Sequence, residues 1–369
     1  MRKVAVFFGG RSSEREISVL TGVFVLNVLN TERYDVIPLY VHTDGGIYTS
    51  AKMFDWKVFK DYKYSAFERV FIEGGVLYAF HPDKKRIKRL KKIDVALNCC
   101  HGGLGEGGGV SAICQWNDIP LASPDLTGSG VFMDKDTTKL AARALNIPTV
   151  EYIRVNEADY RSRGAFLLKS IRSRLKYPVI IKPAHLGSSI GISVAQDEKQ
   201  AQKALESAFE LDDRVVVEKY LVEKQDVNCA AYMLDGDIVV SPVEKAFDSG
   251  VYTFEEKYVK RSADMQKGGG RCALKGEIAN KIRGYTRTLY KRMNLKGVVR
   301  MDFLISENKA YLCEVNTVPG SLAYYLFCER ISDARAFFGD LIEEALRQPP
   351  QKKLVTTGIL NKVKLSPAK

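Results

Sequence analysis

Two segments near the C-terminal end of the chain predict a β-hairpin: Val298-Val-Arg-Met-Asp-Phe-Leu-Ile305 and Glu314-Val-Asn-Thr-Val-Pro-Gly-Ser321. In the first segment an apolar residue recurs at every second position. Side chains of a strand point to opposite faces in turn, so Arg300 and Asp302 share one face of this predicted strand. The Pro-Gly turn at the end leaves the amide of Gly320 free to face a ligand.

The second strand carries the other half of a predicted binding surface. A three-residue loop, residues 307–309, would place Asp302 opposite Glu314 and Arg300 opposite Asn316. Two carboxylates, an amide oxygen and a guanidinium would then share one surface. Oxygen ligands suit Mg²⁺, which usually shares its shell with substrate phosphates, and a guanidinium can hold a developing negative charge. The alternative is a surface hairpin with an ion pair, and the hairpin alone leaves both open.

Length and composition predict a soluble protein of two or three domains, since the chain has 369 residues, 46% hydrophobic and 27% charged. No apolar run approaches a membrane span, and the N-terminus lacks the pattern of a secretion signal. Seven cysteines are scattered without Cys-x-x-Cys spacing, which is typical of reduced thiols. We therefore predict a cytoplasmic protein with no membrane partner.

A net charge of +12 raises the question of nucleic-acid binding. The densest basic run spans residues 84–92. Because Ile87 and Leu90 lie three apart within it, we predict one exposed helix there. No recognised nucleic-acid motif occurs in the chain. We interpret the charge as a solvated basic face that also suits anionic nucleotides, and we expect no nucleic-acid partner.

The first part of the chain predicts a Rossmann-like parallel sheet domain. Buried strands are expected at residues 3–8, 34–41 and 93–99. A helix follows the first strand, and residues 44–82 predict a small antiparallel excursion. The last of these strands runs into a glycine-rich loop, residues 101–109. In such folds ligands bind at the carboxyl ends of the strands, so His101 in this loop is a candidate for ligand contact.

A second strand-and-loop unit predicts a phosphate site. The apolar strand at 177–183 contains Lys182 near its end, where a plain surface lysine is not expected. The loop after it, residues 184–191, is rich in small residues, and we call it the serine–glycine loop. Its backbone amides can wrap a phosphate without obstruction by side chains. No P-loop pattern occurs anywhere, so a nucleotide would be held by another device.

The organisation along the chain suggests three domains and a tail. We predict an N-terminal α/β domain at 1–134, a central subdomain at 135–221, a C-terminal subdomain with the hairpin at 222–348, and a basic tail at 349–369. Residues 245–270 lack periodicity and predict a mobile loop.

Nine short motifs then occur in an order that resembles the D-alanine–D-alanine ligases of the ATP-grasp superfamily, over roughly residues 3–345. They are Gly9-Gly-Arg-Ser-Ser-Glu14, His101 with Glu106, Met133-Asp-Lys135, Ile181-Lys-Pro183, Gly187-Ser-Ser-Ile-Gly191, Glu218-Lys-Tyr-Leu221, Glu256-Lys-Tyr258, Arg300-Met-Asp302 and Glu314-Val-Asn-Thr-Val-Pro-Gly320. The resemblance implies a three-domain ATP-grasp architecture, with ATP gripped between the second and third domains.

The resemblance also implies roles for individual residues. The ATP set would be Lys135, Lys182 and Ser189 at the phosphates, Glu218 with Lys219 and Leu221 at the adenine, and Asp226 at the ribose. The metal set for Mg²⁺, with Mn²⁺ as the alternative ion, would be Asp302, Glu314 and Asn316. The catalytic set would be Glu14 at the ammonium group of the first substrate, Arg300 and the Gly320 amide at the oxyanion, and Ser188 and Tyr258 linked to Glu14. His101 would lie close to the first substrate.

The acceptor pocket departs from the family pattern. Tyr325 stands where the family usually has a Ser that helps to bind the carboxylate of the second substrate. It would narrow the pocket or supply its own hydroxyl, and Lys257 would neutralise that carboxylate. Tyr258 stands where peptide-forming members carry Tyr and ester-forming members often carry Phe. These residues predict an amide product and a small acceptor.

The resemblance implies an ATP-dependent carboxylate–amine ligase that joins two D-alanine molecules through an acyl phosphate for peptidoglycan synthesis. A homodimer is expected on the same ground. One alternative is a ligase of the same fold that joins D-alanine to D-serine or D-lactate. Another is a non-catalytic nucleotide-binding or nucleic-acid-binding protein on an ATP-grasp scaffold.

Overall fold

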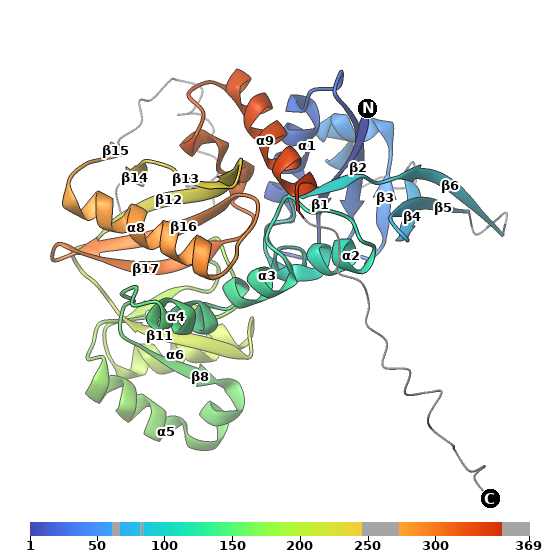
Figure 1. The fold of residues 1–369 in the computed structure, drawn as a ribbon. Helices are drawn as coiled ribbons and strands as arrows, with labels where there is room; N and C mark the ends of the chain where they lie inside the picture. Colours follow the sequence, from blue (N-terminus) through green and yellow to red (C-terminus); the bar gives the residue numbers. More distant parts are fainter. Residues whose placement is uncertain (61–66, 82, 84, 246–272, 349–369) are drawn as a thin grey trace, which may run out of the picture.

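The computed structural model describes residues 1–60, 67–81, 83, 85–245 and 273–348. Three sheets with flanking helices make up this part of the chain (Figure 1). In the residues described, no helix combines the length and apolar character needed to cross a membrane. The helices are α1 (Arg15–Val28), α2 (Val110–Trp116), α3 (Leu126–Met133), α4 (Lys135–Ala144), α5 (Glu157–Arg174), α6 (Glu198–Phe209), α8 (Glu277–Arg292) and α9 (Ala334–Leu346), with short turns η1 (Ala51–Phe54), η2 (Trp56–Phe59), η5 (Gly105–Gly109), η7 (Gly320–Leu326) and η8 (Ile331–Asp333).

The N-terminal sheet has the strand order β6-β5-β4-β3-β2-β1-β7. Its parallel core is β1 (Arg2–Gly9) between β2 (Tyr34–Val41) and β7 (Val95–Asn98). This core confirms the predicted Rossmann-like unit. The whole sheet is mixed, because the antiparallel excursion joins its edge as further strands. They are β3 (Ile47–Thr49), β4 (Glu68–Glu73), β5 (Val76–His81) and β6 (Arg86–Lys92).

The helix predicted for the basic run is wrong, since β6 is a strand paired antiparallel with β5. A register shift interrupts the pairing near Leu77 and Tyr78, which obscures strict alternation. The strand is exposed along nearly its whole length, so it offers little hydrophobic pattern of either period. Lysine and arginine side chains on an edge strand also discourage pairing with another chain.

The central sheet is antiparallel, with the strand order β10-β9-β11-β8. Its strands are β8 (Tyr152–Asn156), β9 (Val179–Pro183), β10 (Ser193–Ala195) and β11 (Arg214–Lys219). Helices α5 and α6 pack on it and share one apolar cluster with it. The serine–glycine loop connects β9 to β10, as predicted.

The third sheet contains the hairpin. Its order is β15-β14-β12-β16-β17, and β13 pairs with β12. The strands are β12 (Gln225–Leu234), β13 (Asp237–Val240), β14 (Val243–Lys245), β15 (Ala273–Leu274), β16 (Val299–Ser306) and β17 (Lys309–Asn316). Figure 1 shows α4 beside β17, on the side that faces the central sheet.

Two apolar clusters cross the predicted domain limits. One joins helix α1 and strand β1 to helix α9 and the turn η7. The other joins Phe132 and Ala142, from α3 and α4, to the third sheet. The four predicted domain ranges stay predictions. The tail at 349–369 lies outside the described residues, as do residues 246–270 of the predicted mobile loop.

Candidate active site

The predicted pairing between the polar residues of the hairpin is present, but the loop and the strands that produce it differ from the prediction. Arg300 lies opposite Asn316 and Asp302 opposite Glu314. The predicted three-residue loop is wrong, because the turn has only two central residues, 307 and 308, with φ of 48° and 56°. Two-residue hairpin turns of this kind require positive φ at both positions.

A β-bulge compensates for the turn being one residue shorter than predicted. Phe303 pairs with Leu312 while Asp302 pairs with Glu314, so Cys313 is the additional residue on β17. A bulge adds one residue to one strand and bends it locally, and it is frequent next to binding sites. Here it brings the Cys313 sulfur to 3.7 Å from the Lys182 ammonium nitrogen.

The polar face of the hairpin is largely enclosed. Arg300 donates from Nε to Asp302 Oδ1 at 2.7 Å and from Nη2 to Oδ2 at 2.8 Å. The Asn316 amide donates to Asp302 Oδ2 at 3.1 Å. The alternative of a surface hairpin also predicted an ion pair, but the Arg300 and Asp302 side chains are only 14% and 18% exposed. Such enclosure is typical of a site and not of a solvated face.

Next to the hairpin, a buried carboxylate lies between two lysines. Glu218, at 1% exposure, pairs with Lys182 at 3.0 Å and with Lys139 at 3.0 Å. Burial alone would raise the pKa of Glu218, but the two ammonium groups lower it to about 2. The side chain predicted to lie at the adenine therefore faces the lysines. Lys139 was missed by the sequence analysis, although its place four residues after Lys135 on one helix face was the available signal.

Lys135 ties the start of α4 to the serine–glycine loop. Its ammonium group donates to the carbonyl of Leu186, and its backbone amide donates to the carbonyl of Ala184 at 3.0 Å. Burial lowers the pKa of Lys135. The negative charge of Glu314 raises this pKa and the positive charge of Lys182 lowers it, and the net shift is downward. The two predicted phosphate lysines are thus electrostatic neighbours beside the predicted metal face.

The serine–glycine loop reaches the N-terminal sheet. The Ser188 hydroxyl donates to Glu14 Oε1, which joins two of the three residues of the predicted hydrogen-bonded link. Ser188 and Ser189 have φ of 51° and 62°. A Cβ on Gly187 would lie 2.7 Å from Glu14 Oε2, so glycine permits this approach. Tyr258 and Lys257 lie outside the described residues.

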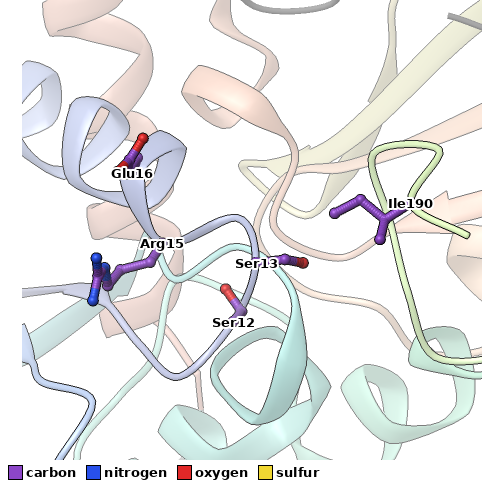
Figure 2. A pocket seen from close by; sticks show the side chains of 5 residues that line it. All are labelled: Ser12, Ser13, Arg15, Glu16 and Ile190. Carbon is purple, nitrogen blue, oxygen red and sulfur yellow. The ribbon is translucent and has the colours of Figure 1, made fainter. Parts of the chain in front are cut away.

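A cavity of about 320 Å³ opens between this loop and the loop that follows β1 (Figure 2). Figure 2 shows Ile190 of the serine–glycine loop on one side, with Ser13 facing it from the other. The lining residues are Ser12, Ser13, Arg15, Glu16 and Ile190. A small molecule fits in a space of this size, and Glu14 lies in the same segment as the residues that line it.

His101 holds the Pro-Gly turn. Its Nδ1 lies 2.7 Å from the Val318 carbonyl, which can only accept, so Nδ1 carries the proton. Burial lowers the pKa of His101 to about 4, so the ring is neutral and Nε2 accepts from Thr21 Oγ1 at 2.8 Å. Thr21 in turn accepts from the Ser321 amide at 3.2 Å. The turn that carries Gly320 is therefore held on both sides, and sequence reasoning missed Thr21.

Glu106 fastens the same turn to the glycine-rich loop. Its Oε1 accepts from the Val318 amide at 3.1 Å, and its Oε2 accepts from the Gly102 amide at 2.8 Å. Burial and then the charge of Glu14 raise the pKa of Glu106 to about 7. These contacts connect β7 to the end of β17.

After the Pro-Gly turn, the chain passes close to Arg300 again. Ser321, Leu322 and Ala323 all have φ of 50°, a left-handed conformation that costs on the order of 1–3 kcal/mol for each residue. After it, the Tyr325 hydroxyl lies 3.2 Å from Arg300 Nη1. A Cβ on Gly320 would meet no atom within 4 Å, so the turn borders open space at this residue.

The predicted adenine and ribose residues lie at the ends of strands. Asp226, near the start of β12, pairs with Lys224 at 2.8 Å. Lys219 ends β11, and its amide donates to the Glu151 carbonyl at 3.0 Å. A base would therefore be read by other backbone groups of 218–221, such as those of Leu221. These two roles stay predictions.

Comparison with known proteins identifies the family. A family model described as the D-ala D-ala ligase C-terminus matches residues 141–347, and one described as the D-ala D-ala ligase N-terminus matches residues 3–124. The chain belongs to the D-alanine–D-alanine ligase family. A D-alanine–D-alanine ligase of Thermosipho africanus is 33% identical over 340 residues, which cover 89% of this chain and 88% of that protein. Members of the family are ATP-dependent, ADP-forming ligases, so the predicted enzyme class is confirmed.

Solved structures of this family share the architecture. The crystal structure of the D-alanine–D-alanine ligase from Helicobacter pylori superposes with a TM-score of 0.77 at 25% identity and covers 95% of this chain and 100% of that chain. The predicted ATP-grasp fold is thereby confirmed. The VanG D-Ala:D-Ser ligase from Enterococcus faecalis has a TM-score of 0.72 at 24% identity and covers 94% and 98%. At that identity only the fold is compared, and the fold does not separate the acceptors.

Proposed function

We propose that this chain joins two D-alanine molecules into D-alanyl-D-alanine for peptidoglycan synthesis, with ATP converted to ADP and phosphate. The observation that carries the proposal is the convergence of three sheets on one site. The N-terminal sheet contributes Glu14, the central sheet contributes Lys182 and Ser188, and the third sheet contributes Arg300 and its hairpin partners. Family membership supports the same reaction.

The hairpin fits a divalent cation. Asp302, Glu314 and Asn316 offer oxygen donors from positions that pair across the two strands. Such donors suit Mg²⁺ or Mn²⁺. When bound, the ion would supply charge neutralisation and orientation for the transferred phosphoryl group. Arg300 holds the Asp302 carboxylate in place by two hydrogen bonds, so this ligand is oriented before any ion arrives.

The lysines would hold the phosphates of ATP. Lys135 and Lys182 come from neighbouring elements and face the same region. In the structure Lys182 shares Glu218 with Lys139. Lys139 can keep Glu218 neutralised when Lys182 turns to a phosphate, so a second lysine lowers the cost of exposing Glu218 to the phosphate charge. The catalysis of phosphoryl transfer is mainly positioning and electrostatics.

The reaction then has two steps. A carboxylate oxygen of the first D-alanine, whose ammonium is bound by Glu14, attacks the γ-phosphorus, the bond to ADP breaks and an acyl phosphate forms. The neutral amine of the second D-alanine attacks the acyl carbon, phosphate leaves with its bonding electrons, and the nitrogen gives up one proton, which the leaving phosphate can accept. Arg300 and the Gly320 amide stabilise the oxyanion between the two events, and loss of one such donor typically costs ~2.7–4 kcal/mol of barrier.

The acceptor site would favour an amide product. Tyr325, whose hydroxyl accepts from Arg300 Nη1 at 3.2 Å, stands close enough to the reaction centre to narrow the pocket. We expect Lys257 to neutralise the acceptor carboxylate and Tyr258 to complete the link of Glu14 and Ser188. D-serine and D-lactate are the alternative acceptors. A homodimer in the cytoplasm, without nucleic-acid or membrane partners, completes the proposal.

Mass analysis of the products tests this proposal. The chain is incubated with ATP, Mg²⁺ and an equal mixture of D-alanine, D-serine and D-lactate. D-alanyl-D-alanine should dominate, with one ADP formed for each dipeptide. A product dominated by D-alanyl-D-lactate or D-alanyl-D-serine would contradict the acceptor assignment. ATP turnover that does not respond to D-alanine would contradict the reaction itself.

A further inference from the structure

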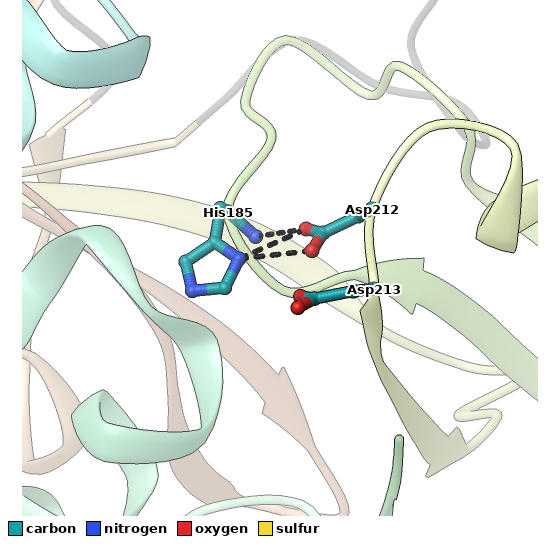
Figure 3. Close-up of side chains that lie close together, drawn as sticks. All are labelled: His185, Asp212 and Asp213. Carbon is teal, nitrogen blue, oxygen red and sulfur yellow. Dashed lines mark hydrogen bonds and ion pairs between the residues drawn. The ribbon is translucent and has the colours of Figure 1, made fainter. Parts of the chain in front are cut away.

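His185 bridges two carboxylates at the start of the serine–glycine loop. Its Nδ1 lies 2.9 Å from Asp212 Oδ1 (Figure 3), and its Nε2 lies 3.4 Å from Asp134 Oδ2. Carboxylates only accept hydrogen bonds, so both ring nitrogens carry protons and the ring is a cation. The hydrogen bonds to Asp134 and Asp212 raise the pKa of His185 to about 9, against the effect of burial.

The arrangement is an ion-pair network and not a metal site. Asp213 lies close enough that one donor atom from each of His185, Asp212 and Asp213 falls within 4.8 Å of the others. Figure 3, however, shows hydrogen bonds from His185 to Asp212 and none to Asp213. A metal-bound imidazole needs an unprotonated nitrogen. In His185, Nδ1 faces Asp212 and Nε2 faces Asp134, so each nitrogen keeps its proton.

The bridge connects three parts of the ATP site. Asp134 caps helix α4 by accepting from the Asp136 amide at 2.7 Å, and it also binds Arg214 of β11. Asp212 accepts from the backbone amide of His185 at 2.7 Å. The next residue of α4, Lys135, is bonded to the serine–glycine loop. The start of the loop, the start of α4 and the start of β11 thus meet at one imidazole.

We propose that charged His185 is a positioning residue for ATP: by bridging Asp134 and Asp212 it fixes the serine–glycine loop against helix α4, so that Lys135 and the loop amides are in place for the phosphates. This inference rests on the proposed function, since it assigns a role within the ATP half of that site. His185 itself touches no reacting atom. Its effect should therefore fall on ATP affinity and leave the chemical step and the D-alanine sites nearly unchanged.

The charges around the ring set the expected pH dependence. Among the described residues, Asp134 just before α4, Asp212 and Asp213 before β11, and Arg214 of β11 surround His185. Three carboxylates outweigh one guanidinium, which favours the protonated ring. The folded-state pKa lies above the ordinary value of 6.5, so the bridge is intact at neutral pH and is lost as the pH rises through about 9.

Steady-state kinetics of the full chain test the positioning role. His185→Asn keeps a short polar side chain but removes the charge and one of the two bonds. We expect KM for ATP to rise roughly 10-fold, with kcat within about threefold and KM for D-alanine unchanged. Asp213→Asn is the matched control, because it removes a neighbouring carboxylate that has no bond to the ring. His81→Asn controls for a surface histidine that pairs with Glu68.

A pH series separates this role from a merely structural one. The ratio of KM for ATP between His185→Asn and wild type should be large near neutral pH and approach one above about pH 9, where the wild-type ring loses its proton. A ratio that stays constant over this range would overturn the proposal, as would an unchanged KM for ATP. If His185→Asn does not fold, Asp212→Asn makes the same test, because it leaves the ring with one acidic partner fewer.

Two readouts keep this inference apart from the proposed function. If wild type forms no dipeptide, the proposed function fails, while direct titration of ATP against wild type and His185→Asn still tests the bridge. If wild type forms D-alanyl-D-alanine and both variants bind ATP equally, only the bridge fails. Thermal stabilisation of wild type by Zn²⁺ or Mn²⁺ that is absent in His185→Asn would also overturn it, because the ring would then be a metal ligand.

Discussion

At the scale of single residues, burial and charge partners decide more than residue type does. Glu218 has the expected place at the end of β11, yet its carboxylate is turned to Lys139 and Lys182. A sequence shows the order of residues along a strand but not which buried cation a carboxylate meets on another helix or strand. For such residues the sequence therefore predicts that a charged side chain belongs to the site, but it does not predict which charged group that side chain contacts.

Lys139 gives a direct test of this pairing. In Lys139→Met, Glu218 keeps only Lys182, so Lys182 is held more firmly by Glu218 and is less available to a phosphate. We expect KM for ATP to rise roughly 10-fold, and the free energy of unfolding to fall by about 3–5 kcal/mol, since one partner of a buried pair is removed. Lys139→Arg keeps the charge and serves as the control. Unchanged ATP affinity in the Met variant would show that Lys182 is not limited by Glu218.

His101 predicts how stability depends on pH. The pKa of its ring falls from 6.5 to about 4 on folding, so the unfolded chain binds the proton more tightly. The contribution is fully present above pH 6.5 and is lost as the pH falls toward 4. Relative to His101→Gln, the free energy of unfolding of wild type should decrease by about 3 kcal/mol over this range. Denaturant titrations at several pH values measure it, and parallel curves for the two proteins would contradict the assignment.

At the scale of elements, the sequence predicts periodic segments well and connections poorly. The strand predicted at 34–41 has those bounds in the structure, and the strand predicted at 3–8 lies within β1. The predicted helix at 84–92 fails because an exposed edge strand has no buried face to impose alternation. The loop of the functional hairpin was misjudged because a bulge and a longer loop give the same pairing at its far end.

The functional hairpin is tested by its carboxylates. Asp302→Asn and Glu314→Gln should each lower kcat by about 100-fold or more, because each would weaken an oxygen ligand of the proposed divalent cation. The fold should persist, since the apolar face of the hairpin is unchanged. Glu307→Gln is the matched control, a carboxylate of the same hairpin at its exposed turn. Full activity of Glu314→Gln at limiting Mg²⁺ would remove Glu314 from the metal set.

At the scale of the whole molecule, the site depends on how the sheets are held together. The chain returns from the third sheet through η7 to helix α9, which packs against α1 and the N-terminal sheet. Phe338 of α9 is fully buried and packs edge-on against Phe24 of α1, with ring centroids 5.9 Å apart. No local pattern in the sequence reveals this contact, because its two sides lie more than 300 residues apart.

Phe338→Ala should therefore separate the two halves of the site in kinetics. Removal of a buried ring costs about 3–5 kcal/mol of stability, and it loosens the N-terminal sheet, with Glu14, relative to the turn that carries Gly320. We expect KM for D-alanine to rise more than KM for ATP, because the lysines and the hairpin belong to the other two sheets. Phe166→Ala, on the exposed face of α5 at 63% exposure, is the control. An equal rise of both constants would mean that the two halves of the site are held together by contacts other than α9.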